Sequence, residues 1–470
     1  MKTTIARLKE LLGRGKVVDD PAIVSLYSRE PSGYRGKGLV VVFPEDVGDV
    51  SKLASLAYKH EIPLYPQGST TSLSGSAVPE GGLIVSFERM WRVREVNVLD
   101  SIVVAEPGVR LGDLNSILAS YNHMFPVDPA SVNIATVGGA INNGSGGMRG
   151  AKYGSMRDWV LGLKVVLADE NGAVLNLGCR TLVCRRGFDL VGLIVGSEGT
   201  LALVSEATLR ITPLPESSVT ILAFLPDIDS LIAVYEDLKS SGVQATILEF
   251  MDPKTVKLGL RASGFRDYVE GYMILATIDC NVEATGRIEG WLRKLALSRG
   301  AIKVYTARSL DEAEARGLFS IRRSLVPSQV QLGALRYPGR EVVVYIEDIS
   351  VPPSKLAEAL RGVEVVSNEV GLDVYVGGHI GDGNIHPTVV IPLDDERLKR
   401  LAEEWHVEVA KLALKLGGTM SSEHGIGLRK KELLAIELGH MGGLKALELM
   451  REIKRVFDPK GVLNPGKIIT

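Results

Sequence analysis

Two prolines, Pro213 and Pro215, separate two different patterns in this 470-residue chain. Before them, from about residue 38, short β-rich runs alternate with turns, whereas strand–helix–strand units repeat after them. Because proline interrupts both helices and sheets, this change of pattern predicts a domain boundary. The chain is therefore expected to have an α+β architecture with more than one domain.

The first part of the chain is predicted to be rich in strands. Strands are expected at residues 38–43, 63–65, 83–86, 102–105, 163–167, 174–177 and 207–211, and amphipathic helices at the N-terminus and over 47–60. Between two of these strands, Asn171-Gly172 predicts a hairpin closed by a type I′ turn, in which both central residues need positive φ.

The second part predicts an antiparallel sheet of split βαβ type, covered by helices on one face. Its units are expected at 219–225, 228–240 and 245–250, then 272–279, 283–298 and 302–305, then 341–346, 353–360 and 372–376. A long amphipathic helix over 394–416 is expected to end at Gly417-Gly418. A further helix is expected over 444–456.

The composition excludes several classes of protein. A formal net charge of −2 without a basic block makes nucleic acid an unfavourable partner. Three cysteines in no Cys-x-x-Cys spacing predict no disulfide, with Cys179 and Cys184 as small apolar residues in a reducing cytoplasm. The sequence contains no run of about 18 uncharged apolar residues, so no transmembrane segment is predicted. A peripheral position at the inner face of a membrane stays compatible with the sequence.

Two clusters of glycine and hydroxyl residues, over 66–75 and over 135–147, predict a binding site for an anion. Glycine turns present backbone N–H groups that can hold a pyrophosphate without a lysine. Neither cluster is a Walker loop or a Gly-x-Gly-x-x-Gly that opens a helix, so a Rossmann domain is disfavoured. Each cluster alone is equally compatible with a structural turn, but the pair favours a dinucleotide.

Two segments near the C-terminal end predict a metal site. His-Ile-Gly-Asp-Gly-Asn-Ile-His at 379–386 lies between two strand-like runs, and Glu-His-Gly-Ile-Gly follows at 423–427. His379, His386 and a carboxylate such as Glu423 would supply two nitrogens and one oxygen, a set that suits Zn²⁺, Mn²⁺ or Fe²⁺ and leaves positions open for a substrate. The alternative is a pair of solvated loops without a ligand.

Taken together, the clusters, residues 196–204, the histidine segments and the terminal Asn-Pro-Gly-Lys resemble a known family. They are similar to the FAD-linked D-2-hydroxy-acid dehydrogenases of the vanillyl-alcohol-oxidase fold, such as the glycolate oxidase flavin subunit, D-lactate dehydrogenase and D-2-hydroxyglutarate dehydrogenase. The resemblance implies a two-subdomain FAD-binding domain over 1–215 and a cap of antiparallel sheet and helices over 216–418. A C-terminal segment over 419–470 would pack back on the FAD domain.

The resemblance also implies roles for individual residues. His379, His386 and Glu423 would bind the divalent metal, His424 would be the catalytic base, and Arg322 would clamp the substrate carboxylate. FAD would be held without a covalent link, because His60 and His123 of the first domain lie outside both clusters. The residues implied to line FAD are Gln67, Gly68, Ser69, Thr70, Thr71, Ser74, Thr136, Val137, Gly138, Gly139, Asn143, Gly144, Ser145, Leu203 and Val204.

The expected reaction is oxidation of a small D-2-hydroxy acid to the 2-keto acid, with hydride transfer to the flavin. The resemblance implies that Ile346 stands where the 2-hydroxyglutarate enzymes carry a lysine, which favours D-lactate or glycolate as the substrate. An external acceptor, namely a quinone, another flavoprotein or an iron–sulfur subunit, would take the electrons, and a homo-oligomer is compatible with the sequence. The alternatives are a D-2-hydroxyglutarate dehydrogenase, a metal hydrolase with structural glycine clusters, and a non-catalytic flavin-binding subunit.

Overall fold

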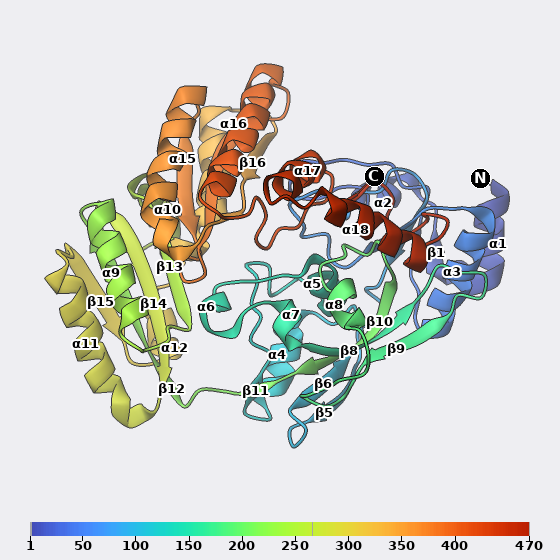
Figure 1. The fold of residues 1–470 in the computed structure, drawn as a ribbon, viewed down its shortest axis with the longest axis horizontal. Helices are drawn as coiled ribbons and strands as arrows, with labels where there is room; N and C mark the ends of the chain where they lie inside the picture. Colours follow the sequence, from blue (N-terminus) through green and yellow to red (C-terminus); the bar gives the residue numbers. More distant parts are fainter. Residues whose placement is uncertain (1, 266, 470) are drawn as a thin grey trace. The chain divides into compact units, whose positions relative to one another are not determined.

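The computed structural model describes residues 2–265 and 267–469, which form two compact units (Figure 1). The first unit comprises Met1–Gly146, Ser155–Leu214 and Glu423–Thr470. The second comprises Gly147–Gly154 and Pro215–Ser422. A short piece of chain before the prolines therefore belongs with the second unit.

The first unit contains two main sheets and the helices around them. Its elements are α1 (Lys2–Leu12), a 3-10 helix (Arg14–Lys16), β1 (Val17–Val18), α2 (Pro21–Leu26), β2 (Val40–Val42), α3 (Val47–His60), β3 (Leu64–Gln67), β4 (Leu83–Ser86), β5 (Val93–Asn97), β6 (Ile102–Ala105), α4 (Leu111–Ala119), β7 (His123–Met124), α5 (Val137–Asn143), α7 (Met156–Trp159), β8 (Val160–Val166), β9 (Val174–Gly178), α8 (Leu190–Ile194), β10 (Leu203–Arg210), β11 (Thr212–Pro213), α17 (Lys431–His440) and α18 (Leu444–Phe457).

The two sheets have different strand directions. The order of the first is β1-β2-β4-β3, in which β4 pairs parallel with β2 and β3, and it packs on apolar residues of α1 and α3. The order of the second is β5-β6-β10-β8-β9, and every pairing in it is antiparallel. The α+β class expected from the sequence is confirmed, and two sheets of different kinds divide the first unit into two subdomains.

The predicted hairpin after β8 is present, but its turn is not of type I′. Strands β8 and β9 pair antiparallel, and Gly172 has φ +61°, whereas Asn171 is not among the residues with positive φ. The side chain of Asp169 accepts hydrogen bonds from the backbone N–H groups of Asn171 and Ala173 at 3.0 Å each. The aspartate thus shapes a longer loop, which the Asn-Gly pair alone did not reveal.

The second unit is built on one large sheet. Its elements are α6 (Gly150–Tyr153), β12 (Ser217–Leu225), α9 (Ile228–Ser240), β13 (Ile247–Met251), α10 (Pro253–Ser263), β14 (Tyr272–Cys280), a 3-10 helix (Val282–Ala284), α11 (Thr285–Ser298), β15 (Lys303–Ala307), α12 (Leu310–Ala315), α13 (Ser320–Arg323), α14 (Leu325–Arg336), β16 (Val342–Ile346), β17 (Ile349–Ser350), a 3-10 helix (Pro353–Lys355), α15 (Leu356–Val370), β18 (Val374–Gly378), β19 (Asn384–Pro392) and α16 (Glu396–Lys415). The strand order β15-β12-β14-β13-β18-β19-β16 is antiparallel throughout, as expected.

Helices cover both faces of this sheet, so the prediction of one covered face was wrong. One face packs against α9, α11, α15 and α16. Leu222 and Phe224 of β12 point to the other face and pack with residues of α10, α12, α13 and α14. The nearly continuous apolar run in β12 is typical of a strand buried on both sides. Helix α15 also continues to Val370, beyond the expected end at residue 360.

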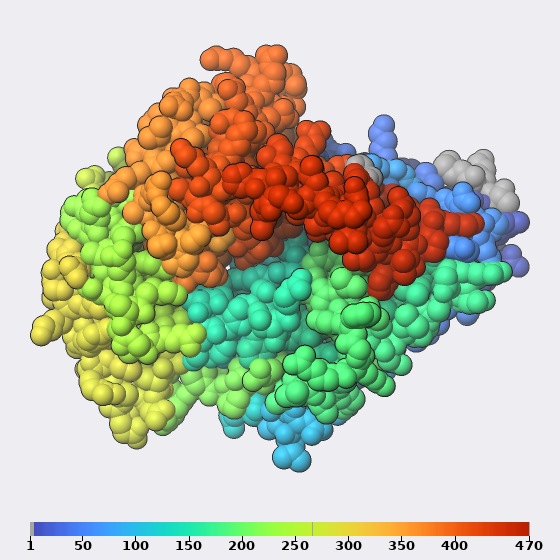
Figure 2. All heavy atoms as spheres, viewed as in Figure 1, coloured from blue at the N-terminus to red at the C-terminus, as the bar shows by residue number. Residues whose placement is uncertain are grey.

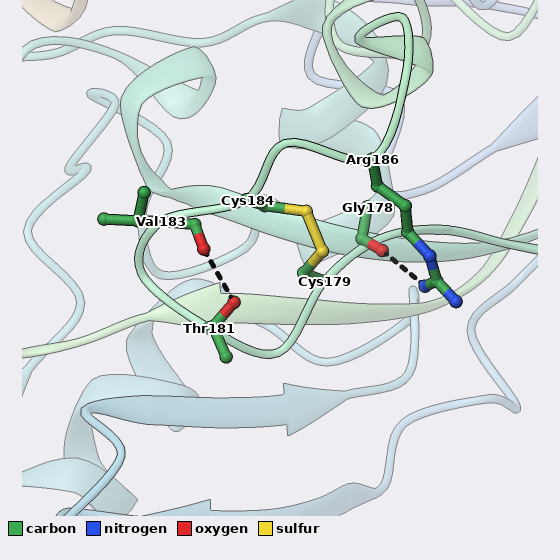
Figure 3. Close-up of a disulfide and its surroundings, with 6 residues drawn as sticks. All are labelled: Gly178, Cys179, Thr181, Val183, Cys184 and Arg186. Carbon is green, nitrogen blue, oxygen red and sulfur yellow. Dashed lines mark hydrogen bonds between the residues drawn. A yellow bond between two sulfur atoms is a disulfide. The ribbon is translucent and has the colours of Figure 1, made fainter.

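A disulfide joins Cys179 and Cys184, which corrects the prediction that these cysteines are unpaired apolar residues (Figure 3). The bridge closes a loop after β9, in which Arg186 Nη1 also donates to the carbonyl of Gly178 at 3.2 Å. This stretch, green in Figure 2, is on the surface, with Phe188 95% exposed. Two cysteines five positions apart can approach only if the intervening loop turns back, and spacing alone does not reveal that turn.

Within residues 2–265 and 267–469, no helix combines the length and the apolar character needed to cross a lipid bilayer.

Candidate functional site

The two glycine clusters line one cleft in the first unit, with an empty volume of about 1220 Å³ that includes open solvent. The predicted cofactor residues that line it are Gln67, Gly68, Ser69, Thr70, Thr71, Thr136, Gly138, Gly139, Asn143, Ser145 and Val204. The sequence analysis missed Pro66, Ser72, Leu73, Phe87, Pro107, Asn142 and Glu198, which also line it. Pro66, Ser72, Leu73 and Asn142 lie within the two clusters, so taking each cluster whole would have included them, whereas Phe87, Pro107 and Glu198 lie outside both clusters.

Four of the predicted cofactor residues do not line the cleft. Val137 and Leu203 are fully buried in the protein core, and Gly144 ends α5 with φ +72°. Ser74 is 1% exposed, and its carbonyl accepts hydrogen bonds from the backbone N–H groups of Leu428 and Arg429. These positions support the walls of the cleft without lining it.

The second cluster opens the short helix α5, although its sequence is not a Gly-x-Gly-x-x-Gly. Thr136 is the N-cap of α5, and its Oγ1 accepts a hydrogen bond from the N–H of Gly139 at 3.2 Å. A Cβ on Gly68 would lie 2.2 Å from Thr136 Oγ1, and one on Gly138 would lie 2.5 Å from Pro107 Cβ. Only glycine permits these close approaches, which bring the two clusters together beside the cleft.

The chemistry of the cleft fits FAD. Its described lining contains no lysine or arginine, so a pyrophosphate would be bound by backbone N–H groups and hydroxyls. Asn142 Oδ1 and Asn143 Oδ1 are buried and accept no hydrogen bond from any described residue. Since buried polar atoms are normally paired, these acceptors suit N–H donors of a bound ligand such as the flavin ring.

The predicted base lies in the same cleft, because Glu423 and His424 are part of its lining. His424 Nε2 is 3.8 Å from Glu423 Oε1, and Asn143 Nδ2 donates to the Glu423 carbonyl at 2.6 Å. A Cβ on Gly146 would lie 2.8 Å from Glu423 Oε2. The second glycine cluster therefore gives the Glu423 side chain room.

The two predicted metal-binding histidines lie together in the second unit. His379 directly follows β18, and His386 lies within β19, with 5.2 Å between the ring centroids. His379 Nδ1 is 2.6 Å from Glu249 Oε1, and His386 Nδ1 is 3.2 Å from the Glu347 carbonyl oxygen. An ionised carboxylate and a carbonyl can only accept, so each Nδ1 donates, and in the neutral ring each Nε2 would carry the lone pair that can coordinate a cation.

Glu249 joins His379 to Arg322, the predicted substrate clamp. Arg322 Nε donates to Glu249 Oε2 at 2.6 Å, and the glutamate side chain has no exposed surface. Burial acts to raise the pKa of Glu249, but the charges and hydrogen bonds of His379 and Arg322 outweigh it and hold the pKa below its usual range. Glu249 thus stays an acceptor for both partners, and Arg322 has only its Nη atoms left for a substrate.

A second polar group supports His386. Asp348 Oδ1 lies 3.9 Å from His386 Nδ1 and accepts a hydrogen bond from Asn384 Nδ2 at 2.8 Å. Asp382, in contrast, accepts from the backbone N–H of Asn384 at 3.2 Å, which is the usual role of an aspartate in a turn. Of the two polar residues between the histidines, Asn384 therefore supports the site and Asp382 shapes the loop.

The predicted site thus consists of two halves. His379, His386 and Arg322 belong to the second unit, and Glu423, His424 and the glycine cleft belong to the first. The meeting of the three predicted metal ligands at one cation stays a prediction.

Two family models match the chain. The model described as "FAD linked oxidases, C-terminal domain" matches residues 214–468, and the model described as "FAD binding domain" matches residues 39–178.

Curated proteins similar to this chain are named for oxidation of hydroxy acids. The "Glycolate oxidase subunit GlcD" of Bacillus subtilis is 32% identical over 95% of this chain and 92% of its own length. The D-lactate dehydrogenase of Archaeoglobus fulgidus is 35% identical over 92% of each chain. The D-2-hydroxyglutarate dehydrogenase of Stutzerimonas stutzeri is 29% identical over 99% of this chain and 98% of its own length.

Solved structures share the fold at low sequence identity. A 4-ethylphenol oxidase from Gulosibacter chungangensis has a TM-score of 0.78 at 19% identity and covers 99% of this chain and 96% of its own. A p-cresol methylhydroxylase has a TM-score of 0.79 at 17% identity, with the same coverage of each chain. At these identities the likeness concerns the fold alone.

Proposed function

Because the chain belongs to the FAD-linked oxidase family, we propose that it oxidises a short D-2-hydroxy acid to the 2-keto acid with the help of a divalent metal. The resemblance seen in the motifs is confirmed for the family, the FAD cofactor and the enzyme class. The substrate, the metal and the roles of single residues belong to the proposal.

The observation that carries the proposal is the place of His424. This histidine and Glu423 line the cleft that both glycine clusters line. An imidazole in the cofactor cleft is well suited to accept a proton, because its ordinary pKa is near 6.5. A cleft lined by the glycine clusters without such a histidine would instead favour a non-catalytic flavin-binding subunit.

In the proposed mechanism, bound FAD supplies the hydride acceptor and a bound Zn²⁺, Mn²⁺ or Fe²⁺ supplies a Lewis acid. His379, His386 and Glu423 would hold the cation, and neutral His424 would take the proton of the substrate hydroxyl. Arg322 would pair with the substrate carboxylate through its Nη atoms, since its Nε already binds Glu249.

A short substrate is favoured by Ile346. This side chain is 8% exposed in β16, at the position where the resemblance implies a lysine in enzymes that act on the longer diacid. A second carboxylate left unpaired beside an apolar side chain would cost several kcal/mol. The runner-up is a D-2-hydroxyglutarate dehydrogenase, because a relative of that name matches nearly the whole chain.

A dye-coupled assay of the FAD- and metal-loaded protein separates these substrates. We expect a higher kcat/KM for D-lactate or glycolate than for D-2-hydroxyglutarate, and little activity with L-lactate. A higher kcat/KM for the diacid would contradict the role given to Ile346 and favour the runner-up.

We further propose that FAD is bound without a covalent link and passes its electrons to an external acceptor, such as a quinone, another flavoprotein or an iron–sulfur subunit. Denaturation in acid should release all flavin absorbance into the supernatant. Colour that stays in the protein pellet would contradict the non-covalent link.

A further inference from the structure

We propose that Glu198 is a positioning residue, whose carboxylate fixes the backbone of the segment Glu423–Gly427 and thereby the place of the His424 ring. The inference rests on the proposed role of His424 as the base. Glu198 lies in the Gly-Ser-Glu-Gly-Thr segment at 196–200, which lacked a chemical role in the sequence analysis.

The contacts of the Glu198 carboxylate are with the backbone that follows His424. Oε1 accepts hydrogen bonds from the N–H of Ile426 at 2.6 Å and of Gly427 at 3.0 Å, and Oε2 accepts from Gly427 at 2.9 Å. Gly425 lies between these residues and His424 with φ +83°, and a Cβ there would be 2.6 Å from Oε1. The turn after His424 therefore wraps closely around this carboxylate.

Glu198 is itself held by contacts from other parts of the first unit. Its N–H donates to the Asn142 carbonyl at 2.7 Å, and its own carbonyl accepts from Asn464 Nδ2 at 2.6 Å. The residue adopts φ +52°, a left-handed conformation that is unfavourable for a residue other than glycine. Strain of this kind persists where surrounding contacts fix it, and it concentrates at functional sites.

Asn143 holds the other end of the segment. Its Nδ2 donates to the Glu423 carbonyl at 2.6 Å, so the backbone is fixed just before His424 as well as two and three residues after it. The backbone on both sides of His424 is thus held, and with it the point from which the ring extends. Misplacing a reacting group by about 1 Å can cost roughly 100-fold in rate, which is the scale on which Glu198 would act.

The electrostatics of Glu198 are unfavourable for a residue that serves stability alone. Burial raises its pKa to about 7, although the hydrogen bonds from Gly427 and Ile426 oppose this rise. Taking an ionised carboxylate out of water costs free energy that these hydrogen bonds only partly offset. If Glu198 serves stability alone, Glu198→Gln should leave the rate of flavin reduction unchanged. If Glu198 positions His424, the same change should slow flavin reduction.

The test is a double-mutant cycle on flavin reduction, measured by stopped flow in the FAD- and metal-loaded protein. Glu198→Gln should bind FAD fully and keep KM within about threefold, while flavin reduction slows by roughly 10- to 100-fold. In a His424→Ala background the same change should have no further effect, because Glu198 acts through His424. Equal losses in both backgrounds, or no loss in either, would overturn the proposal.

Two further variants complete the experiment. Asp458→Asn is the matched control, because Asp458 is also a buried carboxylate of the first unit that accepts two backbone N–H groups, those of Val462 and Leu463. It should leave the rate of flavin reduction within about twofold. If Glu198→Gln does not fold, Gly425→Ala disturbs the same turn from the other side and should give the same His424-dependent loss; a wild-type rate would overturn the proposal.

The failure of this inference and the failure of the proposed function give different results. If His424→Ala reduces flavin at the wild-type rate, His424 is not the base, and the proposed function and the inference both fail. If His424→Ala is slow while Glu198→Gln is not, the base stands and only the positioning role fails.

Discussion

Two buried glutamates, one in each unit, hold predicted site residues in opposite electrostatic settings. Glu249 binds His379 and Arg322, and these partners hold its pKa below the usual range despite burial. Among the described residues, Glu198 accepts hydrogen bonds from backbone N–H groups alone, and burial raises its pKa to about 7. Both glutamates are buried, but Glu249 stays ionised, whereas Glu198 has a pKa close to neutral pH.

The difference shows what a buried carboxylate needs in order to stay ionised. Neutral N–H donors stabilise an anion, but in this protein they do not offset the loss of hydration, whereas a guanidinium and an imidazole do. We therefore expect the histidine pair to be held firmly over a broad pH range. The His424 segment should be held in a way that depends on the protonation of Glu198.

The largest expected effect is that of His424→Ala. If the first unit carries the base, flavin reduction should slow by roughly 10²- to 10⁴-fold, the usual scale for the loss of general-base catalysis. FAD and metal should stay bound, because the predicted cofactor and metal ligands are unchanged. Stopped-flow reduction at nearly the wild-type rate would assign the proton transfer elsewhere.

The next effect concerns stability and pH. Glu198 has a folded pKa of about 7 and an ordinary value of 4.5, so the folded state keeps a proton that the unfolded state releases between these values. The free energy of unfolding should therefore fall by about 3 kcal/mol from this residue alone as the pH rises from 4.5 to 7. Urea unfolding of wild type and Glu198→Gln across this range measures it, and a pH-independent difference between them would contradict it.

A smaller effect is expected from Glu249→Gln. The amide can still accept from His379 but no longer balances the charge of Arg322, so metal affinity should fall by roughly 10- to 100-fold. Metal content after dialysis against chelator buffers provides the measurement, and FAD should remain bound. Glu289→Gln removes another glutamate paired with an arginine, Arg308, and should leave metal affinity unchanged. Equal affinities for Glu249→Gln and wild type would show that Glu249 does not orient His379.

The sequence predicted local structure well where a short window contains the signal. The helix over 47–60 and the strand over 83–86 have the bounds that their apolar spacing indicated. The clusters, the histidine segments and the Glu-His pair were all recognised, because each is a compact run of unusual composition. The family followed from their order along the chain.

The parts that were missed depend on contacts between distant residues. Glu249 lies 130 positions before His379, and Glu198 lies 228 positions before Ile426, so no motif joins the partners. Helices α10 and α12–α14 escaped notice although the continuous apolar run of β12 indicated a second covered face. The disulfide between Cys179 and Cys184 depends on a loop shape that spacing does not encode.

The smallest expected effect comes from Lys467, which sharpens the contrast between the two carboxylates. This lysine is 1% exposed, and its charge is among the influences that lower the pKa of Glu198. Lys467→Met should raise the pKa of Glu198 further, by less than about one pH unit, so the fall in stability should continue to higher pH. Comparing this variant with and without Glu198→Gln isolates the shift, because the effects of Lys467 itself cancel. Lys460→Met, at a partly exposed ion pair with Glu61, is the control. A midpoint that stays near pH 7 would mean that burial and the backbone N–H groups alone set the state of Glu198.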